Sequence, residues 1–323
     1  MKKKDKAEPE KSTHNRRLSY VAIAVILMLV LGSILYFVHY NQTMQPKAAI
    51  IDELGSSQLS PISRYSNQTF VETATELLHE RFSVVDYYSD NATVENYERL
   101  ASDGYELIIW RAHSALDLKN KYIAISTCEA NNSLRESEYS EYLYNGQLTL
   151  CNITGDPQYY YAITPSFITG VMNGRFDDTV IILMSCNGLA WGYDTTAQTF
   201  EQKGARVFIS WDWWINSTKN DNAITLLLKY LIDDNDTIEQ AVLKIPPQYN
   251  PEYGTNPSTG LAYSTLTYDP VSDNVSNYVI PNYKQTNVVS SIGSMAVAIL
   301  KKTKPIEISG SRRWLNQVDP LNV

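Results

Sequence analysis

The sequence predicts an α/β domain with a doubly wound, mostly parallel sheet flanked by helices. Two short and nearly continuous apolar runs, Tyr105–Ala112 and Thr179–Ser185, have the pattern of strands buried on both faces. Runs of this kind alternate with helical patterns along the chain, which is typical of β-α-β units. The chain has 323 residues, 44% of them hydrophobic, so it is long enough to bury one large core.

The N-terminal part of the chain predicts a membrane anchor. Residues 1–17 carry seven Lys or Arg residues against three acids, and residues 18–40 form an almost uninterrupted apolar run. This run is longer than the apolar core of a cleaved signal peptide and long enough to cross a bilayer. Because the basic flank precedes it, we expect residues 1–17 in the cytoplasm and the chain after residue 40 outside, in a single-pass protein of the cell membrane.

Two features fit this extracytoplasmic location. Eight Asn-x-Ser/Thr sequons follow the apolar run, although an unglycosylated surface rich in Asn, Ser and Thr would also produce them. The first 17 residues hold seven of the 27 basic and three of the 35 acidic residues, so the rest has a net charge of −12, which argues against nucleic acid as a partner. The candidate glycosylation sites are Asn41, Asn67, Asn91, Asn131, Asn152, Asn216, Asn235 and Asn274.

The domain expected over residues 41–290 opens with a β-α-β-α-β pattern. Apolar residues recur at helical spacing from Phe70 to Phe82. A second helix opens on Thr93 in a pattern like a capping box, and Gly104 ends it. The expected strands are Ala48–Ile51, Ser83–Tyr88 and Tyr105–Ala112, and the expected helices are Phe70–Phe82 and Thr93–Ser102.

Residues 114–165 interrupt this rhythm. They are rich in Tyr, Asn, Ser and Thr, and short alternating runs recur within them. We therefore predict a β-rich insertion with strands at Tyr122–Thr127, Gln147–Cys151 and Tyr159–Ile163. Cys128 and Cys151 are expected to form a disulfide, because an extracytoplasmic domain is oxidising, and this pairing leaves Cys186 as the odd thiol.

The alternation resumes after the insertion and ends in long loops. Residues 246–287 are rich in Tyr, Pro, Asn and Thr and predict loops with a few strands, and residues 291–323 form a C-terminal extension. The expected strands are Thr179–Ser185 and Ala205–Trp211, and the expected helices are Pro165–Gly174, Thr195–Lys203, Asn220–Leu231 and Thr237–Leu243.

Two reactive side chains follow neighbouring strands of the predicted sheet. His113 follows the third strand and Cys186 follows the fourth. Ligands of open α/β sheets bind beyond the carboxyl ends of the strands, so we expect the two side chains to meet there as a thiolate–imidazole pair. Either residue alone would more often be structural. The small residues after the Cys, Asn187 and Gly188, leave backbone amides free to stabilise an oxyanion.

Other chemistries lack their sequence patterns. The four histidines show no metal-ligand spacing and no Cys-x-x-Cys is present, so no metal site is predicted. No Gly-rich phosphate loop and no Gly-x-Ser-x-Gly motif occurs, and we expect no cofactor.

The order of these motifs resembles the caspase-like (clan CD) cysteine peptidases, which include caspases, legumains, clostripain, gingipains, separase and CHAT domains. The resemblance covers roughly residues 48–245 and extends to Lys203–Ile209, which is similar to the Gly-Ala start of that family's fifth strand. It implies that Cys186 attacks the scissile carbonyl and that His113 is the general acid–base. It also implies an oxyanion hole formed by the backbone amides of Cys186 and Ser114.

The chain departs from the family at positions that bear on specificity. Ser114 stands where the family usually has Gly, and Met184 stands where several members have an Asp that selects a basic residue before the scissile bond. We expect Trp211, Asp212 and Trp213 to line the substrate cleft instead, with Asp212 binding Lys or Arg. The tryptophans would alternatively pack under the long loops, and Arg111 is a second candidate, for an acidic substrate residue.

The sequence therefore predicts a membrane-anchored, extracytoplasmic cysteine endopeptidase acting on protein or peptide substrates. The alternative is a catalytically inactive glycoprotein of the same fold that serves as a surface-binding or envelope-structural module. Transamidation onto another protein would use the same Cys–His pair. Iodoacetamide reactivity of Cys186 would separate the enzyme from the module.

Overall fold

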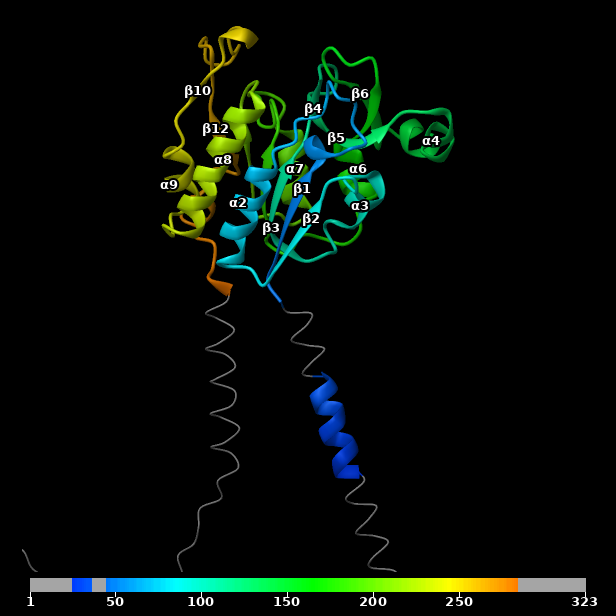
Figure 1. The fold of residues 1–323 in the computed structure, drawn as a ribbon, viewed down its shortest axis with the longest axis vertical. Coiled ribbons are helices and arrows are strands. Elements are labelled where there is room, and N and C mark those ends of the chain that lie inside the picture. The colour runs from blue at the N-terminus through cyan, green and yellow to red at the C-terminus, as the bar shows by residue number, and fades with distance from the viewer. Residues whose placement is uncertain (1–24, 37–44, 284–323) are drawn as a thin grey trace, which may run out of the picture. The chain divides into compact units, whose positions relative to one another are not determined.

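The computed structural model describes residues 25–36 and 45–283 and contains a central six-stranded sheet (Figure 1). The sheet has the order β12-β9-β8-β3-β1-β2, and all neighbours are parallel except β12, which is antiparallel to β9. The predicted α/β class with a mostly parallel sheet is therefore confirmed. The strands are β1 (Lys47–Asp52), β2 (Val84–Tyr88), β3 (Tyr105–Arg111), β8 (Val180–Met184), β9 (Val207–Trp211) and β12 (Leu266–Asp269).

The central strands owe their positions to continuous apolar sequence. Every residue of β8 and β9 is buried, and in β3 only Glu106 is partly exposed. Strands of this kind need helices on both faces. The edge strand β2 is only partly buried along its length, as its more polar sequence predicts.

Helices cover the sheet on both faces (Figure 1). On one side, α2 packs against α8, and α8 against α9. On the other side, Trp110 of β3 lies edge-on to Tyr97 of α3 and to Phe200 of α7, at the centre of the main hydrophobic core. The helices are α2 (Gln68–His79), α8 (Ser217–Ile232) and α9 (Ile238–Leu243) on the first side, and α3 (Val94–Arg99), α6 (Pro165–Gly170) and α7 (Thr195–Gln202) on the second.

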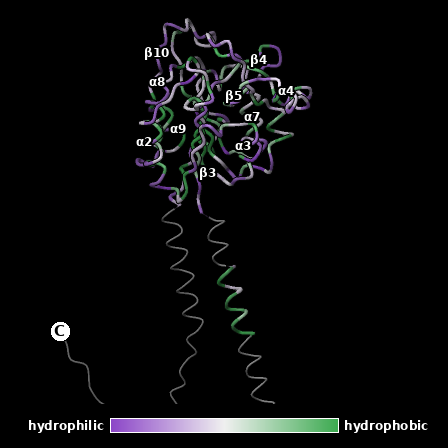
Figure 2. The backbone as a smooth tube through the Cα atoms, turned by 45° about the vertical axis from the view of Figure 1, so that its right-hand side comes forward, coloured by the Kyte–Doolittle hydropathy of each residue, from purple (hydrophilic) through white to green (hydrophobic). Residues whose placement is uncertain are grey.

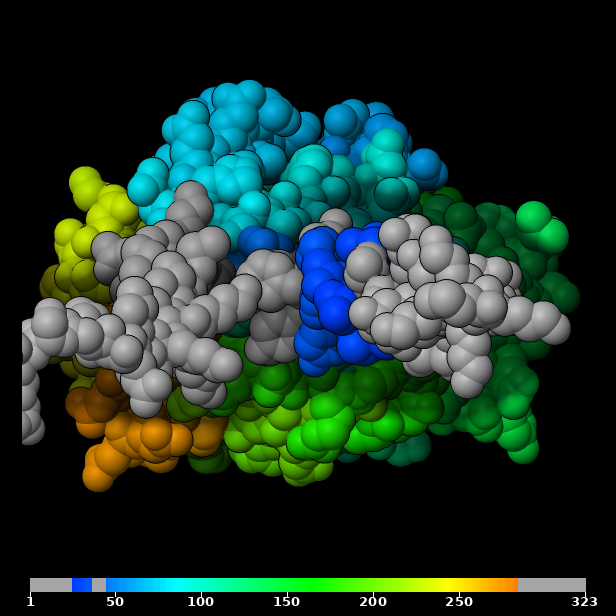
Figure 3. Space-filling view, turned by 90° about the horizontal axis from the view of Figure 1, so that it is seen from below, coloured from blue at the N-terminus to red at the C-terminus, as the bar shows by residue number. Residues whose placement is uncertain are grey.

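The two edges of the sheet belong to different parts of the chain. Figure 3 shows the early residues of the domain (cyan) along one side of the lower face and the latest described residues (orange) toward the opposite side. This arrangement follows from a strand order that runs from β2 at one edge to β12 at the other.

A second, antiparallel sheet grows from the end of β3. Its strand order is β4-β5-β7-β6, and β4 begins three residues after β3 ends. All three strands expected between residues 114 and 165 are present, with a fourth strand immediately after His113. The elements are β4 (Ser114–Asp117), β5 (Tyr122–Ala130), α4 (Ser133–Glu138), α5 (Ser140–Tyr144), β6 (Leu148–Asn152) and β7 (Tyr159–Ile163).

The structure does not contain the predicted disulfide between Cys128 and Cys151, and both thiols are free and buried. Cys128 lies on β5 and Cys151 on β6, and β7 separates these strands in the sheet. The thiols also point to different acceptors: Cys128 donates to the carbonyl oxygen of Asp90 (3.5 Å), and Cys151 donates to the hydroxyl of Ser126 (3.5 Å).

The segment predicted as long loops contains several short elements. The most important is β12, which completes the main sheet by pairing with β9. The compact unit that contains the sheet ends at Pro281, and a second unit starts at Asn282. The short elements are η1 (Glu53–Gly55), near the start of the domain, and β10 (Gln248–Tyr249), η2 (Pro251–Tyr253), β11 (Tyr263–Ser264) and α10 (Asp273–Ser276).

Part of the expected membrane anchor falls on described residues. Residues 25–36 are helical and hydrophobic (Figure 2). Across residues 25–36 and 45–283, the structure contains no helix with the length and apolar character needed to cross a bilayer. The remainder of the 18–40 run, Asn41 and the extension 291–323 lie outside the described residues.

Candidate active site

A cavity of about 650 Å³ opens at the carboxyl edge of the main sheet, and His113 and Cys186 both line it. The register of the sheet explains why they meet. Arg111 of β3 pairs with Met184 of β8, and each reactive residue follows its paired residue by two positions. Neighbouring parallel strands that end in register place the next residues at the same edge.

The ring of His113 is fixed on two sides. It lies edge-on to Tyr65, with ring centroids 5.7 Å apart, and its Nε2 is 2.9 Å from the carbonyl oxygen of Ser63. A carbonyl oxygen only accepts hydrogen bonds, so a neutral ring carries its hydrogen on Nε2 and leaves Nδ1 as the basic nitrogen.

The electrostatics favour this neutral form of His113. Burial is the largest effect and lowers the pKa of His113 to about 4. The hydrogen bond to the Ser63 carbonyl oxygen opposes this shift, whereas the nearby Arg111 guanidinium adds to it. At pH 7 the imidazole is therefore unprotonated and able to accept a proton.

Cys186 lines the same cavity and is held as a thiol by hydrogen bonds to Ile215. Its Sγ accepts from the N–H of Ile215 (3.4 Å) and donates to the carbonyl oxygen of the same residue (3.5 Å). Burial raises the pKa of Cys186 to about 11, although the Ile215 N–H favours the thiolate. The sequence predicts a thiolate–imidazole pair, whereas these pKa shifts favour a neutral thiol at Cys186 and a neutral imidazole at His113 at pH 7.

The loops after β3 and β8 are tied together at the expected oxyanion site. The Ser114 hydroxyl donates to the carbonyl oxygen of Cys186, and among the described residues the Cys186 N–H has no acceptor. The turn continues through Asn187, which has a φ of 57°, into Gly188. A Cβ on Gly188 would lie 1.9 Å from the Ser210 hydroxyl oxygen, so only glycine fits against β9 at this point.

A buried ion cluster that the sequence did not reveal supports the end of β3. The Arg111 guanidinium bonds Asp52 (2.8 Å) and, through two nitrogens, Asp221 of α8 (2.7 and 2.9 Å). It also donates to the carbonyl oxygen of Tyr65 (2.5 Å). Because the guanidinium and both carboxylates are buried and paired, Arg111 is a structural tether and is not available to bind an acidic substrate residue.

Glu53 supports His113 from behind. It is fully buried in η1, and its Oε2 accepts from the His113 backbone N–H (3.0 Å), while its Oε1 has no hydrogen-bond partner within the part of the chain that the structure describes. Burial raises the pKa of the Glu53 carboxyl to about 8, and the hydrogen bond from the His113 N–H opposes this shift. At pH 7 this carboxyl is therefore largely protonated, and its role is to position the His113 backbone.

The residues expected to select the substrate point elsewhere. Trp211 is fully buried in β9 and donates to Asn220 of α8 (2.9 Å). Asp212 accepts from the Thr265 backbone N–H (2.7 Å), and neither it nor Trp213 lines the cavity. Trp214, the last tryptophan of the same run, does line the cavity.

Some candidate glycosylation sites carry structural contacts. The Asn67 side chain caps α2 and donates to Asp221 (2.8 Å), and Asn216 caps α8 and lines the cavity. A glycan on either would disturb these contacts. Four others are exposed and one is intermediate; the exposed ones are Asn91, Asn152, Asn235 and Asn274, and the intermediate one is Asn131.

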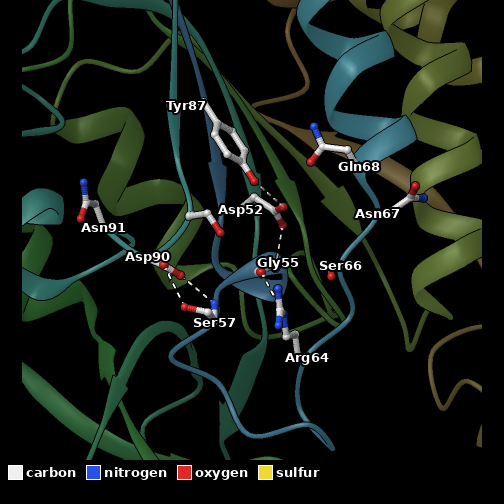
Figure 4. A pocket seen from close by; sticks show the side chains of 11 residues that line it. Asp52, Gly55, Ser57, Arg64, Ser66, Asn67, Gln68, Tyr87, Asp90 and Asn91 are labelled. Carbon is white, nitrogen blue, oxygen red and sulfur yellow. Dashed lines mark hydrogen bonds between the residues drawn. The ribbon is translucent and has the colours of Figure 1, made fainter.

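A second cavity, of about 560 Å³, lies beyond β1 and β2 (Figure 4). Its carboxylates already have partners: Asp52 bonds Arg111 and Tyr87, and Asp90 accepts from Ser57. Among the described residues no group of three or more His, Cys, Asp or Glu side chains is placed to hold a metal ion.

Comparison with known proteins gives no assignment. No protein-family model matches the chain, and no curated protein sequence matches it significantly.

Proposed function

We propose that this chain is a caspase-like cysteine endopeptidase that cleaves peptide bonds through a Cys186–His113 dyad. The observation that carries the proposal is the convergence of the two side chains in one cavity, each two residues beyond a paired position of adjacent parallel strands. Strands β1, β2, β3, β8 and β9 stand in the doubly wound order 2-1-3-4-5, whose ligands bind at this edge of the sheet. This supports the family resemblance as a fold-level analogy.

In the acylation step, Nδ1 of His113 takes the proton of the Cys186 thiol as Sγ attacks the carbonyl carbon. The carbonyl oxygen becomes an oxyanion, which accepts hydrogen bonds from the N–H groups of Cys186 and Ser114. The intermediate collapses with loss of the amine, which takes the proton from the imidazolium, and a thioester remains.

Deacylation uses the same residues. A water molecule attacks the thioester carbonyl carbon while His113 takes a proton from the water. The second tetrahedral intermediate then releases the carboxylic acid, and the imidazolium returns its proton to the sulfur of Cys186, which restores the thiol. Ser114 adds a specific contribution, because its hydroxyl fixes the Cys186 carbonyl and so orients the turn that carries the Cys186 N–H.

The cellular setting is part of the proposal. The apolar run 18–40 would anchor the protein with residues 1–17 in the cytoplasm, and the domain would act outside on surface or secreted proteins. The exposed sequons, such as Asn91 and Asn274, fit a glycoprotein.

One observation favours a second candidate, an inactive binding or envelope-structural module of the same fold. Burial raises the pKa of Cys186 to about 11 and lowers that of His113 to about 4, so neither group is charged at neutral pH. In the peptidase the proton moves only when substrate is bound, whereas in the module the thiol stays inert.

The pH dependence of peptide hydrolysis tests the proposed mechanism. His113 must be unprotonated to act as a base, and its pKa of about 4 predicts kcat/KM that is constant from about pH 6 to 9 and falls as pH drops through about 4. His113→Ala should lower kcat/KM by about 10² to 10⁴-fold, and His79→Ala on α2 should not change it.

The profile would be measured with a pool of quenched fluorescent peptides on the full chain in detergent, with return to pH 7 as a control for acid unfolding. An acid limb centred near pH 6.5 or above, or an active His113→Ala variant, contradicts the assigned role of His113.

A further inference from the structure

Among the described residues, the dyad cavity is lined by one acidic side chain and no basic one. That side chain is Glu252, and no other Asp, Glu, Lys or Arg of the described part of the chain lines the cavity. The dyad adds no charge at pH 7, because burial lowers the pKa of His113 to about 4 and raises that of Cys186 to about 11.

The loop that carries Glu252 is anchored next to Cys186. Glu252 lies in η2, between β10 and β11, and the preceding Asn250 donates to the carbonyl oxygen of Trp214 (3.0 Å). Tyr253 stacks on the Trp214 ring, with centroids 5.7 Å apart and planes 20° apart. Trp214 in turn directly precedes Ile215, which holds the Cys186 thiol.

The Glu252 carboxylate is available to a ligand. It has no hydrogen bond and no ion pair with any of the residues that the structure describes. Lys219, which contacts the same loop, donates to the carbonyl oxygen of Tyr249 and to the side chain of Asn250 (3.1 Å).

Part of the wall suits the stem of a long side chain, and polar side chains line much of the remainder. Leu54, Met184 and Ile215 are apolar, and Trp214 and Tyr253 present aromatic surface. An unpaired carboxylate that shares a cavity with apolar and aromatic side chains attracts a cation on an aliphatic stem, through charge and cation–π contacts.

We propose that Glu252 determines specificity by binding the cationic side chain of a Lys or Arg residue on the amino side of the scissile bond. This inference rests on the proposed peptidase function. The basic-residue specificity expected of Asp212 is thereby assigned to a residue 40 positions later, on a loop that lines the cavity.

The test uses irreversible labelling of Cys186 by peptidyl acyloxymethyl ketones that differ only in the residue next to the reactive group. Lys, norleucine and Glu serve as a cation, a neutral chain of similar length and an anion. The second-order labelling rate is measured by intact-protein and peptide mass spectrometry on the full chain in detergent. The variants are Glu252→Gln and Glu252→Lys, with Glu138→Gln as a control at an exposed carboxylate outside the cavity.

The Lys reagent should label Cys186 of the wild type about 10-fold faster than the norleucine reagent, because a partly exposed ion pair and a cation–π contact combine. Glu252→Gln should remove most of this ratio, Glu252→Lys should favour the Glu reagent, and Glu138→Gln should behave as wild type. The ratio should also shrink at high salt.

Two results overturn the inference, and they differ in what they imply. If Cys186 is labelled at rates that do not depend on the charge of the reagent or on Glu252, this inference fails while the proposed function stands. If no peptidyl reagent labels Cys186, both the proposed function and the inference fail.

Discussion

Replacing Cys186 with alanine is expected to lower peptide hydrolysis by at least about 10³-fold. The variant lacks the atom that forms the thioester, and loss of a nucleophile from a unit that acts together leaves only the contribution of binding and the oxyanion site. The measurement is kcat/KM on quenched fluorescent peptides, compared at equal concentrations of folded protein.

Two further variants test whether the loss of activity is specific to the Cys186 thiol. Cys128→Ala removes a free thiol on β5 of the second sheet, which donates to the carbonyl oxygen of Asp90 and does not line the cavity, so the variant should retain activity. Cys186→Ser keeps an oxygen that can bond Ile215, so it separates loss of the nucleophile from loss of packing. Substantial hydrolysis by Cys186→Ala, at more than a tenth of the wild-type rate, contradicts the account.

Replacing Arg111 with alanine is expected to lower the free energy of unfolding by about 3 to 5 kcal/mol, the cost of breaking a buried ion pair from one side. The substitution leaves the Asp52 and Asp221 carboxylates buried without their cation. It also releases the link between the end of β3, α8 and the loop at Tyr65 that packs on His113. Urea unfolding followed by tryptophan fluorescence measures the change.

The matched control is Arg206→Ala, which breaks a pair with Asp178 that is partly exposed. A pair of this kind contributes about 1 kcal/mol or less. A loss at Arg111 no larger than the loss at Arg206 shows that the buried cluster does not stabilise the sheet as described.

The sequence was sufficient for the main sheet because buried parallel strands are continuous apolar runs. The runs before His113 and Cys186 form β3 and β8 almost to the residue, and their adjacency follows from the β-α-β pattern. The position of both residues in one cavity followed from the rule that ligands bind beyond the strand ends.

Features that depend on long-range packing could not be predicted in this way. Cys128 and Cys151 are close in the sequence of the insertion, but β7 pairs between their strands. In the Trp211–Trp214 run, the path of the backbone at the end of β9 determines where each ring lies. The Trp211 ring is fully buried, and of the three tryptophans only Trp214 lines the cavity. Glu252 comes to the site from a loop whose composition carries no strand or helix pattern.

The charge states of His113 and Cys186 could not be predicted from the sequence either. A His and a Cys at neighbouring strand ends suggested an ion pair, but both pKa shifts come mainly from burial, which depends on the finished fold. Glu53 is a similar case, because its contact with the His113 backbone joins residues that are distant in sequence.

The most direct measurement of the central claim is intact-protein mass spectrometry during turnover of a slow peptide ester, with rapid acid quenching. We expect an adduct with the mass of the acyl group, mapped to Cys186, that disappears as product forms. The adduct should be absent in Cys186→Ala and should form more slowly in His113→Ala. Turnover without any adduct, or an adduct on Cys128 or Cys151 alone, would contradict Cys186 as the nucleophile.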